Sequence, residues 1–204
     1  MKWKNLKKLI WYFLSYFLTM FLVMLIDRFV LLGKYDHGSS YYITDELIYS
    51  PGNMAAVSIF FYFLVLFIIE KPCWNVYKNF LHLKLKPVLI SLAAGIGIQL
   101  ISGLFFLIFK MDNTDTQIGL ACFLAPFAEE IFFREMIYDL FSEKAAIIIS
   151  SILFALCHFN PCHLVIYLIF GFMLAFIRKK WNVAYCIIAH LMANAIAFAV
   201  PFFS

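Results

Sequence analysis

Long apolar runs recur along this chain, and they constrain its fold more than any other feature. An α-helix needs about 20 residues to cross the apolar core of a bilayer, and the longer runs reach this length. Of the residues, 65% are hydrophobic and 20% aromatic, whereas soluble domains are about 45–50% apolar. A chain of 204 residues accommodates at most seven or eight such helices and no soluble domain besides. We therefore expect an all-α fold, with residues 1–204 forming one membrane domain, a polytopic helical bundle.

Polar segments between the apolar runs divide the chain into about seven predicted transmembrane helices. The first follows the basic segment 1–8 and is longer than the apolar part of a signal peptide, so we expect it to be retained. In the third, Gly95, Gly97 and Gly103 would permit close contact between helices. In the fourth, Pro126 is expected to bend the helix. The predicted spans are approximately 9–32, 54–69, 87–109, 117–141, 145–159, 164–177 and 181 to the C-terminus.

The basic residues fall mostly on one side of the predicted membrane. Under this scheme, 12 of the 16 Lys and Arg residues lie in segments 1–8, 70–86, 142–144 and 178–180. Since cytoplasmic loops are enriched in Lys and Arg, we expect a multi-pass protein of the cell membrane with a cytoplasmic N-terminus and an external C-terminus. The net charge of +4 is small, and the basic residues form short clusters beside apolar runs. We therefore do not expect nucleic acid as a partner. The five cysteines form no C-x-x-C pair, so neither a disulfide framework nor a zinc ribbon is supported.

Charged residues interrupt the fourth predicted span, among them Glu129, Glu130 and Arg134. A charge at the bilayer centre costs roughly 2.5–3.5 kcal/mol, so such residues usually face a protein interior or a wet cavity and pair with one another. On a helix, Glu130 and Arg134 share a face, while Glu129 points about 100° away. We expect the arginine to hold one glutamate as a structural pair and to leave the other as a base. The residues alone do not decide which, except that the arginine lies four positions after Glu130. The alternative is a charge pair that only orients helices.

Two histidines are the polar exceptions in later apolar runs. Phe154 lies one helical turn before His158, and Asn194 lies one turn after His190. At 1.5 Å per residue, Glu129, His158 and His190 lie at depths of about 18, 20 and 14 Å, so the three could meet in one layer. A carboxylate, two imidazoles and an amide would supply the base, the acid and the oxyanion donors that hydrolysis of an amide requires.

In this order on successive spans, three motifs resemble those of the CPBP family of intramembrane proteases. The family is also called the CAAX protease and bacteriocin-processing or Abi family. The motifs are E-E-x-x-x-R at 129–134, F-x-x-x-H at 154–158 and H-x-x-x-N at 190–194. Each motif is weak by itself, whereas the ordered set is specific. The resemblance covers about 117–199, the expected catalytic core, and the first half of the chain resembles nothing specific.

The resemblance implies an intramembrane endopeptidase that hydrolyses a peptide bond with activated water and without a cofactor. The implied partners are the lipid bilayer and a membrane-associated protein or peptide substrate. The substrate could be a CAAX protein, a bacteriocin or a signalling peptide, and a role in bacteriocin self-immunity is also within the family's range. The family implies that Glu129 and His158 activate the water, that His190 and Asn194 form the oxyanion hole, and that Glu130, Arg134 and Phe154 support the site.

Other interpretations of the same residues remain open. Glu129, His158 and His190 could bind zinc as one carboxylate and two imidazoles, although the chain lacks H-E-x-x-H. A non-enzymatic bacteriocin immunity or binding protein is the alternative from a different class. A proton-coupled transporter also uses buried Glu and His, but the sequence has no evident inverted repeat. A cysteine nucleophile is disfavoured, because Cys157 and His158 are adjacent on a helix and point about 100° apart.

Overall fold

The computed structural model describes residues 3–26, 72–109, 121–158 and 161–199. These residues form helices and turns and contain no strand, which confirms the all-α class for them. The predicted second span, 54–69, and the loops 33–53 and 110–116 lie outside the described residues. The helices are α1 (Trp3–Ile26), α4 (Pro72–Leu81), α5 (Leu85–Phe109), α6 (Ala121–Glu130), the π-helix η3 (Ile131–Met136), α7 (Ile137–Leu140), α8 (Glu143–Cys157), α9 (Leu164–Lys180) and α10 (Val183–Ala199).

The observed helices follow the predicted spans closely in the second half of the chain. The fourth predicted span consists of α6, η3 and α7 in direct succession. Helices α8, α9 and α10 have 15, 17 and 17 residues, about 22–26 Å at 1.5 Å per residue, which is less than the roughly 30 Å of a bilayer core. Among the described residues, α5 is the one helix that is both long and apolar enough to cross a membrane. The number of spans therefore stays a prediction.

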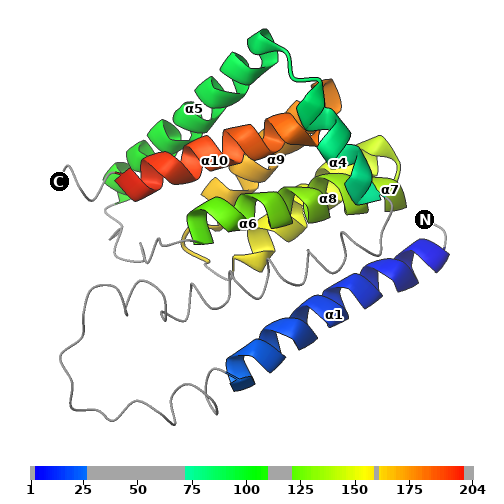
Figure 1. The fold of residues 1–204 in the computed structure, drawn as a ribbon. Helices are drawn as coiled ribbons and strands as arrows, with labels where there is room; N and C mark the ends of the chain where they lie inside the picture. The colour runs from blue at the N-terminus through cyan, green and yellow to red at the C-terminus, as the bar shows by residue number, and fades with distance from the viewer. Residues whose placement is uncertain (1–2, 27–71, 110–120, 159–160, 200–204) are drawn as a thin grey trace.

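Helix α10 lies at the centre of the bundle (Figure 1). It packs against α5 on one side and α6 on the other, and it also contacts α9 and α4. Helix α8 packs mainly against α9. Small side chains allow neighbouring helices to approach α10, because Ala184, Ala189 and Ala193 are all fully buried in it. Of the two histidines of the predicted site, His158 thus lies at the end of α8 and His190 lies on α10. Helix α9 comes between these two helices in the sequence.

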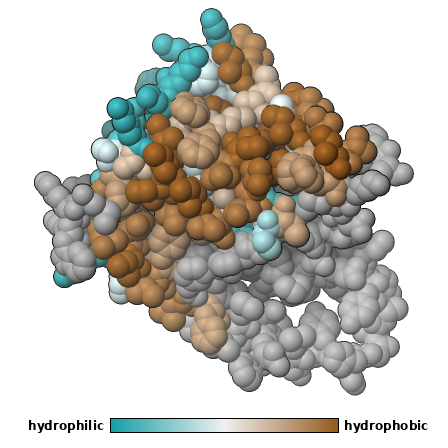
Figure 2. All heavy atoms as spheres, turned by 180° about the vertical axis from the view of Figure 1, so that it is seen from behind, coloured by the Kyte–Doolittle hydropathy of each residue, from teal (hydrophilic) through white to brown (hydrophobic). Residues whose placement is uncertain are grey.

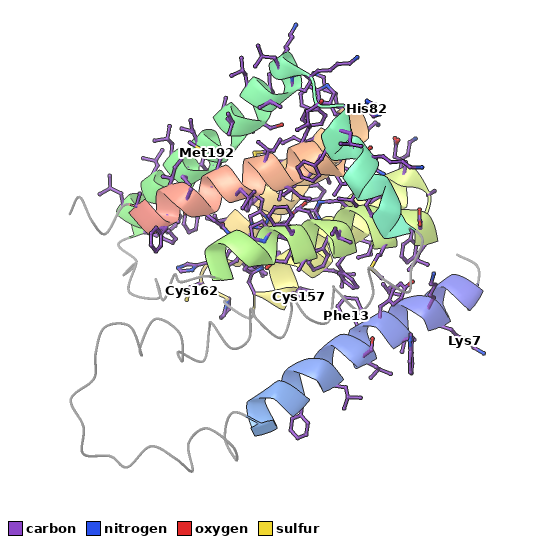
Figure 3. The ribbon with its side chains drawn as sticks, in the orientation of Figure 1. Lys7, Phe13, His82, Cys157, Cys162 and Met192 are labelled. Carbon is purple, nitrogen blue, oxygen red and sulfur yellow. The ribbon has the colours of Figure 1, made fainter. Side chains whose placement is uncertain are left out.

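Gly95 permits the close approach of α5 to α10. A Cβ atom at this position would collide with the carbonyl oxygen of Ala189 and the Cβ of Met192, which lies beside α5 in Figure 3. Gly97 and Gly103 have no described atom near the position that a Cβ would take. Within the described part of the chain, the predicted close contact is therefore found at Gly95, and for the other two glycines it stays a prediction.

Helix α1 docks on the π-helix through aromatic side chains. Phe13 points from α1 toward the bundle in Figure 3, and its ring lies edge-on to Phe132 with the centroids 5.4 Å apart. Tyr12 makes a second edge-on contact with Phe132 at 6.4 Å. Such edge-to-face pairs stabilise by about 0.5–1.5 kcal/mol beyond the area that they bury. The first helix therefore supports the segment that carries the charged motif.

Much of the outer surface is apolar. Figure 2 shows a broad hydrophobic surface, with most of the hydrophilic residues gathered at one end of the molecule. On α5, Leu100 and Leu107 are 70% and 76% exposed. Soluble monomers rarely expose such large continuous apolar areas, and a surface of this kind is typical of contact with lipid or another protein.

Candidate active site

Glu130, the last residue of α6, joins three helices through its buried carboxylate. Its Oε1 lies 2.9 Å from Nδ1 of His190 on α10, and its Oε2 lies 3.4 Å from Nε of Arg134. Arg134 in turn donates a hydrogen bond of 3.1 Å from its guanidinium to the carbonyl oxygen of Gly171 on α9. Glu130 and Arg134 are fully buried. Pairing offsets the cost of burying the two charges, although Oε2 of Glu130 and Nε and Nη1 of Arg134 have no hydrogen-bond partner among the described residues.

The charged motif continues into a π-helix that the sequence did not predict. At its end the N–H of Ile137 donates to the carbonyl of Phe132, five residues earlier. From α9, Nε of Arg178 donates to the carbonyl of Arg134 at 3.0 Å and forms an ion pair with Glu135 at 3.0 Å. Short π-helical segments inside α-helices occur frequently at functional sites. Arg178 therefore braces, from outside the motif, the segment that carries Arg134.

Glu129 differs from its neighbour Glu130 in its surroundings. It is half-buried, and its Oε2 atom is buried with no hydrogen-bond partner among the described residues. Buried polar atoms are nearly always hydrogen-bonded, so an orphaned carboxylate oxygen indicates a place for water or a ligand. The two adjacent carboxylates are therefore divided, with Glu130 engaged and Glu129 available.

His158 directly follows α8 as its C-cap residue, and two contacts fix its ring. Its Nδ1 lies 2.8 Å from the carbonyl oxygen of Phe154, and its ring stacks on Tyr167 of α9 at 3.9 Å between centroids and 24° between planes. A carbonyl oxygen accepts hydrogen bonds and cannot donate them, so we infer that Nδ1 carries the proton. In the neutral imidazole, Nε2 then holds the free lone pair that a general base needs.

Phe154 lies between the two histidines and is fully buried. Its ring centroid is 4.8 Å from that of His158 and 5.7 Å from that of His190. The guanidinium carbon of Arg134 lies 5.3 Å from the same centroid, within the range of a cation–π contact. Both histidines therefore contact Phe154, whereas the expectation that Glu129 meets them in one layer stays a prediction.

The protonation of His190 follows from its partner in the same way. Its Nδ1 faces Oε1 of Glu130, and an ionised carboxylate only accepts, so Nδ1 carries a proton. The other ring nitrogen, Nε2, can then donate a hydrogen bond only when the ring is an imidazolium. Asn194 lies one turn further along α10 and is half-buried.

The described residues contain no group of three His, Cys, Asp or Glu side chains that could hold a metal ion. The zinc interpretation requires Glu129, His158 and His190, which are all among the described residues and do not form such a group. Among the described residues, Cys157, Cys162 and Cys186 form no disulfide, and the first two are labelled in Figure 3.

Several residues around the site could not be found from the motifs. They are Tyr167, which stacks on His158, Gly171, whose carbonyl accepts from Arg134, and Arg178, which binds Glu135. For Arg178 the sequence offered only a basic cluster at a predicted membrane boundary. For Tyr167 a weak signal exists, because it lies one helical turn inside α9, close in sequence to His158.

Comparison with known proteins supports the resemblance. A family described as "Type II CAAX prenyl endopeptidase Rce1-like" matches residues 116–196. A protein of Bacillus subtilis (strain 168), described as "Putative membrane peptidase YdiL", is 37% identical over 76 residues. This similarity covers 35% of the chain and 31% of the relative, about a third of its length. No solved structure matches the chain.

The family match includes all three motifs and the helices that carry them, from α6 to most of α10. The buried Glu130–Arg134 pair and the two histidines around Phe154 lie inside it. Rce1-like proteins are a family of proteases. Residues 116–196 of this chain are thus similar to the Rce1-like family of endopeptidases, which agrees with the resemblance of its motifs to the CPBP family.

Proposed function

We propose that this protein is an intramembrane endopeptidase that hydrolyses a peptide bond in a membrane-associated protein or peptide. The observation that carries the proposal is the unequal engagement of the two adjacent glutamates. Glu130 forms an ion pair with Arg134 and contacts His190. Glu129 has no ion pair among the described residues, and its Oε2, like that of Glu130, has no hydrogen-bond partner there. A carboxylate outside the ion pair, beside one that is held in it, suits a general base better than a structural role.

The first chemical step is attack of water on the scissile carbonyl carbon. The water donates one hydrogen bond to Glu129 and a second to Nε2 of His158, whose Nδ1 proton is directed to the Phe154 carbonyl. As the oxygen–carbon bond forms, the water proton passes to Glu129 and the carbonyl oxygen becomes an oxyanion. When the carbon–nitrogen bond breaks, the same proton goes to the leaving nitrogen, which departs as a neutral amine.

The oxyanion requires donors, which we assign to His190 and Asn194. Since Nδ1 of His190 faces a carboxylate, its Nε2 donates when the ring is an imidazolium. The positive charge of that ring would be offset by Glu130, which has no contact with solvent. Preorganised donors of this kind contribute most where water is excluded, because their dipoles need not reorient during the reaction. No cofactor takes part in this mechanism.

The substrate class and topology belong to the same proposal. The family description names a CAAX prenyl endopeptidase, which supports a membrane-associated protein or peptide of CAAX type as substrate. A bacteriocin or a signalling peptide stays an alternative substrate. The apolar surface and the span α5 support residence in a membrane. We propose a multi-pass protein with a cytoplasmic N-terminus, because most Lys and Arg residues fall in alternate predicted loops. Labelling of a cysteine introduced into 34–50 from outside intact cells tests this orientation.

The experiment that tests the activity is mass spectrometry of membrane peptides and culture supernatant. Cells that carry the wild-type protein are compared with cells that carry Glu129→Ala at equal membrane abundance. We expect a cleavage product that appears with the wild type only, and its ends identify the substrate and the bond. If the biological effect persists with Glu129→Ala and no product differs, the protein is a binder, as the immunity interpretation holds.

A further inference from the structure

His158 lies at the end of its helix, so its side chain is constrained less than the site residues that lie within helices. His158 is the C-cap residue of α8, and the regular helix ends before it. Its Nδ1 bond to the Phe154 carbonyl fixes one atom of the ring, but one hydrogen bond leaves the ring free to tilt about that point. A base must hold its lone pair within hydrogen-bond reach of the water throughout the reaction. A second constraint on the ring plane is therefore needed.

Tyr167 supplies a contact of the required kind. Its ring lies nearly parallel to that of His158, with centroids 3.9 Å apart and planes at 24°. The contact with Phe154 is longer and more tilted, at 4.8 Å and 57°. A parallel stack restricts tilting of the ring plane in the direction that the hydrogen bond to the Phe154 carbonyl leaves open.

Tyr167 is itself held by neighbouring aromatic side chains and by the backbone. It packs against the main hydrophobic core, and its N–H donates to the His163 carbonyl at 3.0 Å. The ring of His163 lies edge-on to Tyr167 at 6.2 Å and contacts Phe106 of α5 at 4.7 Å. The rings of Phe106, His163 and Tyr167 therefore form a row that connects α5 to His158 at the end of α8.

We propose that Tyr167 is a positioning residue that holds the imidazole of His158 in its working plane. The inference rests on the proposed function, in which Nε2 of His158 accepts a hydrogen bond from the attacking water. The stack keeps the ring plane, and with it the lone pair of Nε2, directed at the water. Tyr167 touches neither the water nor the substrate and acts through His158.

The test compares two variants of Tyr167 with a matched control on the same helix. Tyr167→Phe keeps the ring, and Tyr167→Leu removes it but keeps an apolar side chain. Phe176→Leu removes an aromatic ring from an exposed position of α9. An aromatic contact of about 0.5–1.5 kcal/mol corresponds to roughly a two- to thirteen-fold change in rate. We expect Tyr167→Leu to lower kcat by this factor with little change in KM, and Tyr167→Phe and Phe176→Leu to resemble the wild type.

A spectroscopic readout separates positioning from general damage and needs no substrate. A stacked aromatic ring shifts the carbon-bound protons of the histidine upfield through its ring current. In protein with labelled histidine, the His158 signals, assigned with His158→Ala, should move downfield in Tyr167→Leu and stay in place in Tyr167→Phe. If Tyr167→Leu proves unstable, Tyr167→Met provides a second side chain without a ring.

The outcomes distinguish this inference from the proposed function. If the wild type cleaves nothing, the proposed function fails, while the His158 signals still report whether Tyr167 holds the ring. A folded Tyr167→Leu protein with wild-type kcat, or with unchanged His158 signals, overturns the positioning role. Equal loss of kcat in Tyr167→Phe and Tyr167→Leu also overturns it, because the hydroxyl and not the ring would then be required.

Discussion

Nδ1 of His190 lies 2.9 Å from Oε1 of Glu130, the glutamate that also faces Arg134. The central helix α10 is thereby joined to the charged motif at the carboxylate that is already paired. This arrangement gives the buried carboxylate two cationic or donor groups and leaves the adjacent Glu129 outside the network. The contact also determines that Nδ1 of His190 carries a proton. The Glu130–Arg134 pair and His190, the proposed oxyanion donor, are therefore coupled through Glu130.

Removing the guanidinium of Arg134 should damage the protein more than removing both charges of the pair. Arg134→Ala leaves Glu130 buried beside His190 without its arginine, and breaking a buried pair from one side costs roughly 3–5 kcal/mol. Arg134→Ala combined with Glu130→Gln leaves no buried carboxylate at this position and should recover part of the lost stability. Thermal unfolding in detergent and membrane abundance measure both. Equal loss in the single and double variants would count against the pairing.

Arg178 should matter for stability although it lies outside the motifs. Arg178→Ala removes the donor to the Arg134 carbonyl and the partner of Glu135, which is 5% exposed. Hydrogen bonds to charged groups contribute about 1.5–3 kcal/mol each, so we expect a loss in this range.

The matched control for Arg178 is its neighbour in the sequence. Lys179 forms an ion pair of 3.1 Å with Glu143, but both side chains are about half exposed. Exposed pairs contribute about 0–1 kcal/mol, so Lys179→Ala should leave the melting temperature nearly unchanged. Similar melting temperatures for the two alanine variants would show that Arg178 does not brace the π-helix.

An added methyl group should destabilise the protein at Gly95, where α5 contacts α10, but not at Gly97. Gly95→Ala places a Cβ against the backbone of Ala189, which cannot move as a flexible side chain would. Overpacking of this kind costs about 1–3 kcal/mol. Gly97→Ala meets no described atom and should be neutral or slightly stabilising, since alanine favours a helix. Equal unfolding temperatures would mean that α5 lies further from α10 than the structure shows.

A strong chelator should leave the cleavage rate of the purified protein unchanged. Activation of water by Glu129 and His158 requires no metal in the proposed mechanism. If the chelator abolished cleavage and added zinc restored it, Glu129, His158 and His190 would take the role of ligands instead. Bound zinc should then fall in step with His158→Ala and His190→Ala.

The sequence predicted those parts of the site that depend on spacing within one helix. Glu130 and Arg134 pair, and Phe154 contacts His158, because residues four apart share a helical face. The apolar runs likewise predicted the helices from α5 to α10 with small errors at their ends.

What the sequence missed depends on contacts between helices. The rotation of α10 about its own axis decides that His190 meets Glu130, and no spacing rule within a helix fixes that rotation. Arg178 and Arg134 lie 44 positions apart in the chain. The π-helix at 131–136 was missed because the apolar period alone does not distinguish it from a continuous α-helix.

The most direct test of the proposed chemistry is the rate at which purified Glu129→Gln cleaves a peptide that spans the identified bond. Glutamine keeps the shape and the hydrogen bonding of the side chain but removes the base. Our mechanism predicts that this variant unfolds at the wild-type temperature and shows no detectable cleavage. Cleavage at the wild-type rate by folded Glu129→Gln would contradict the assignment of Glu129 as the base and with it the proposed mechanism.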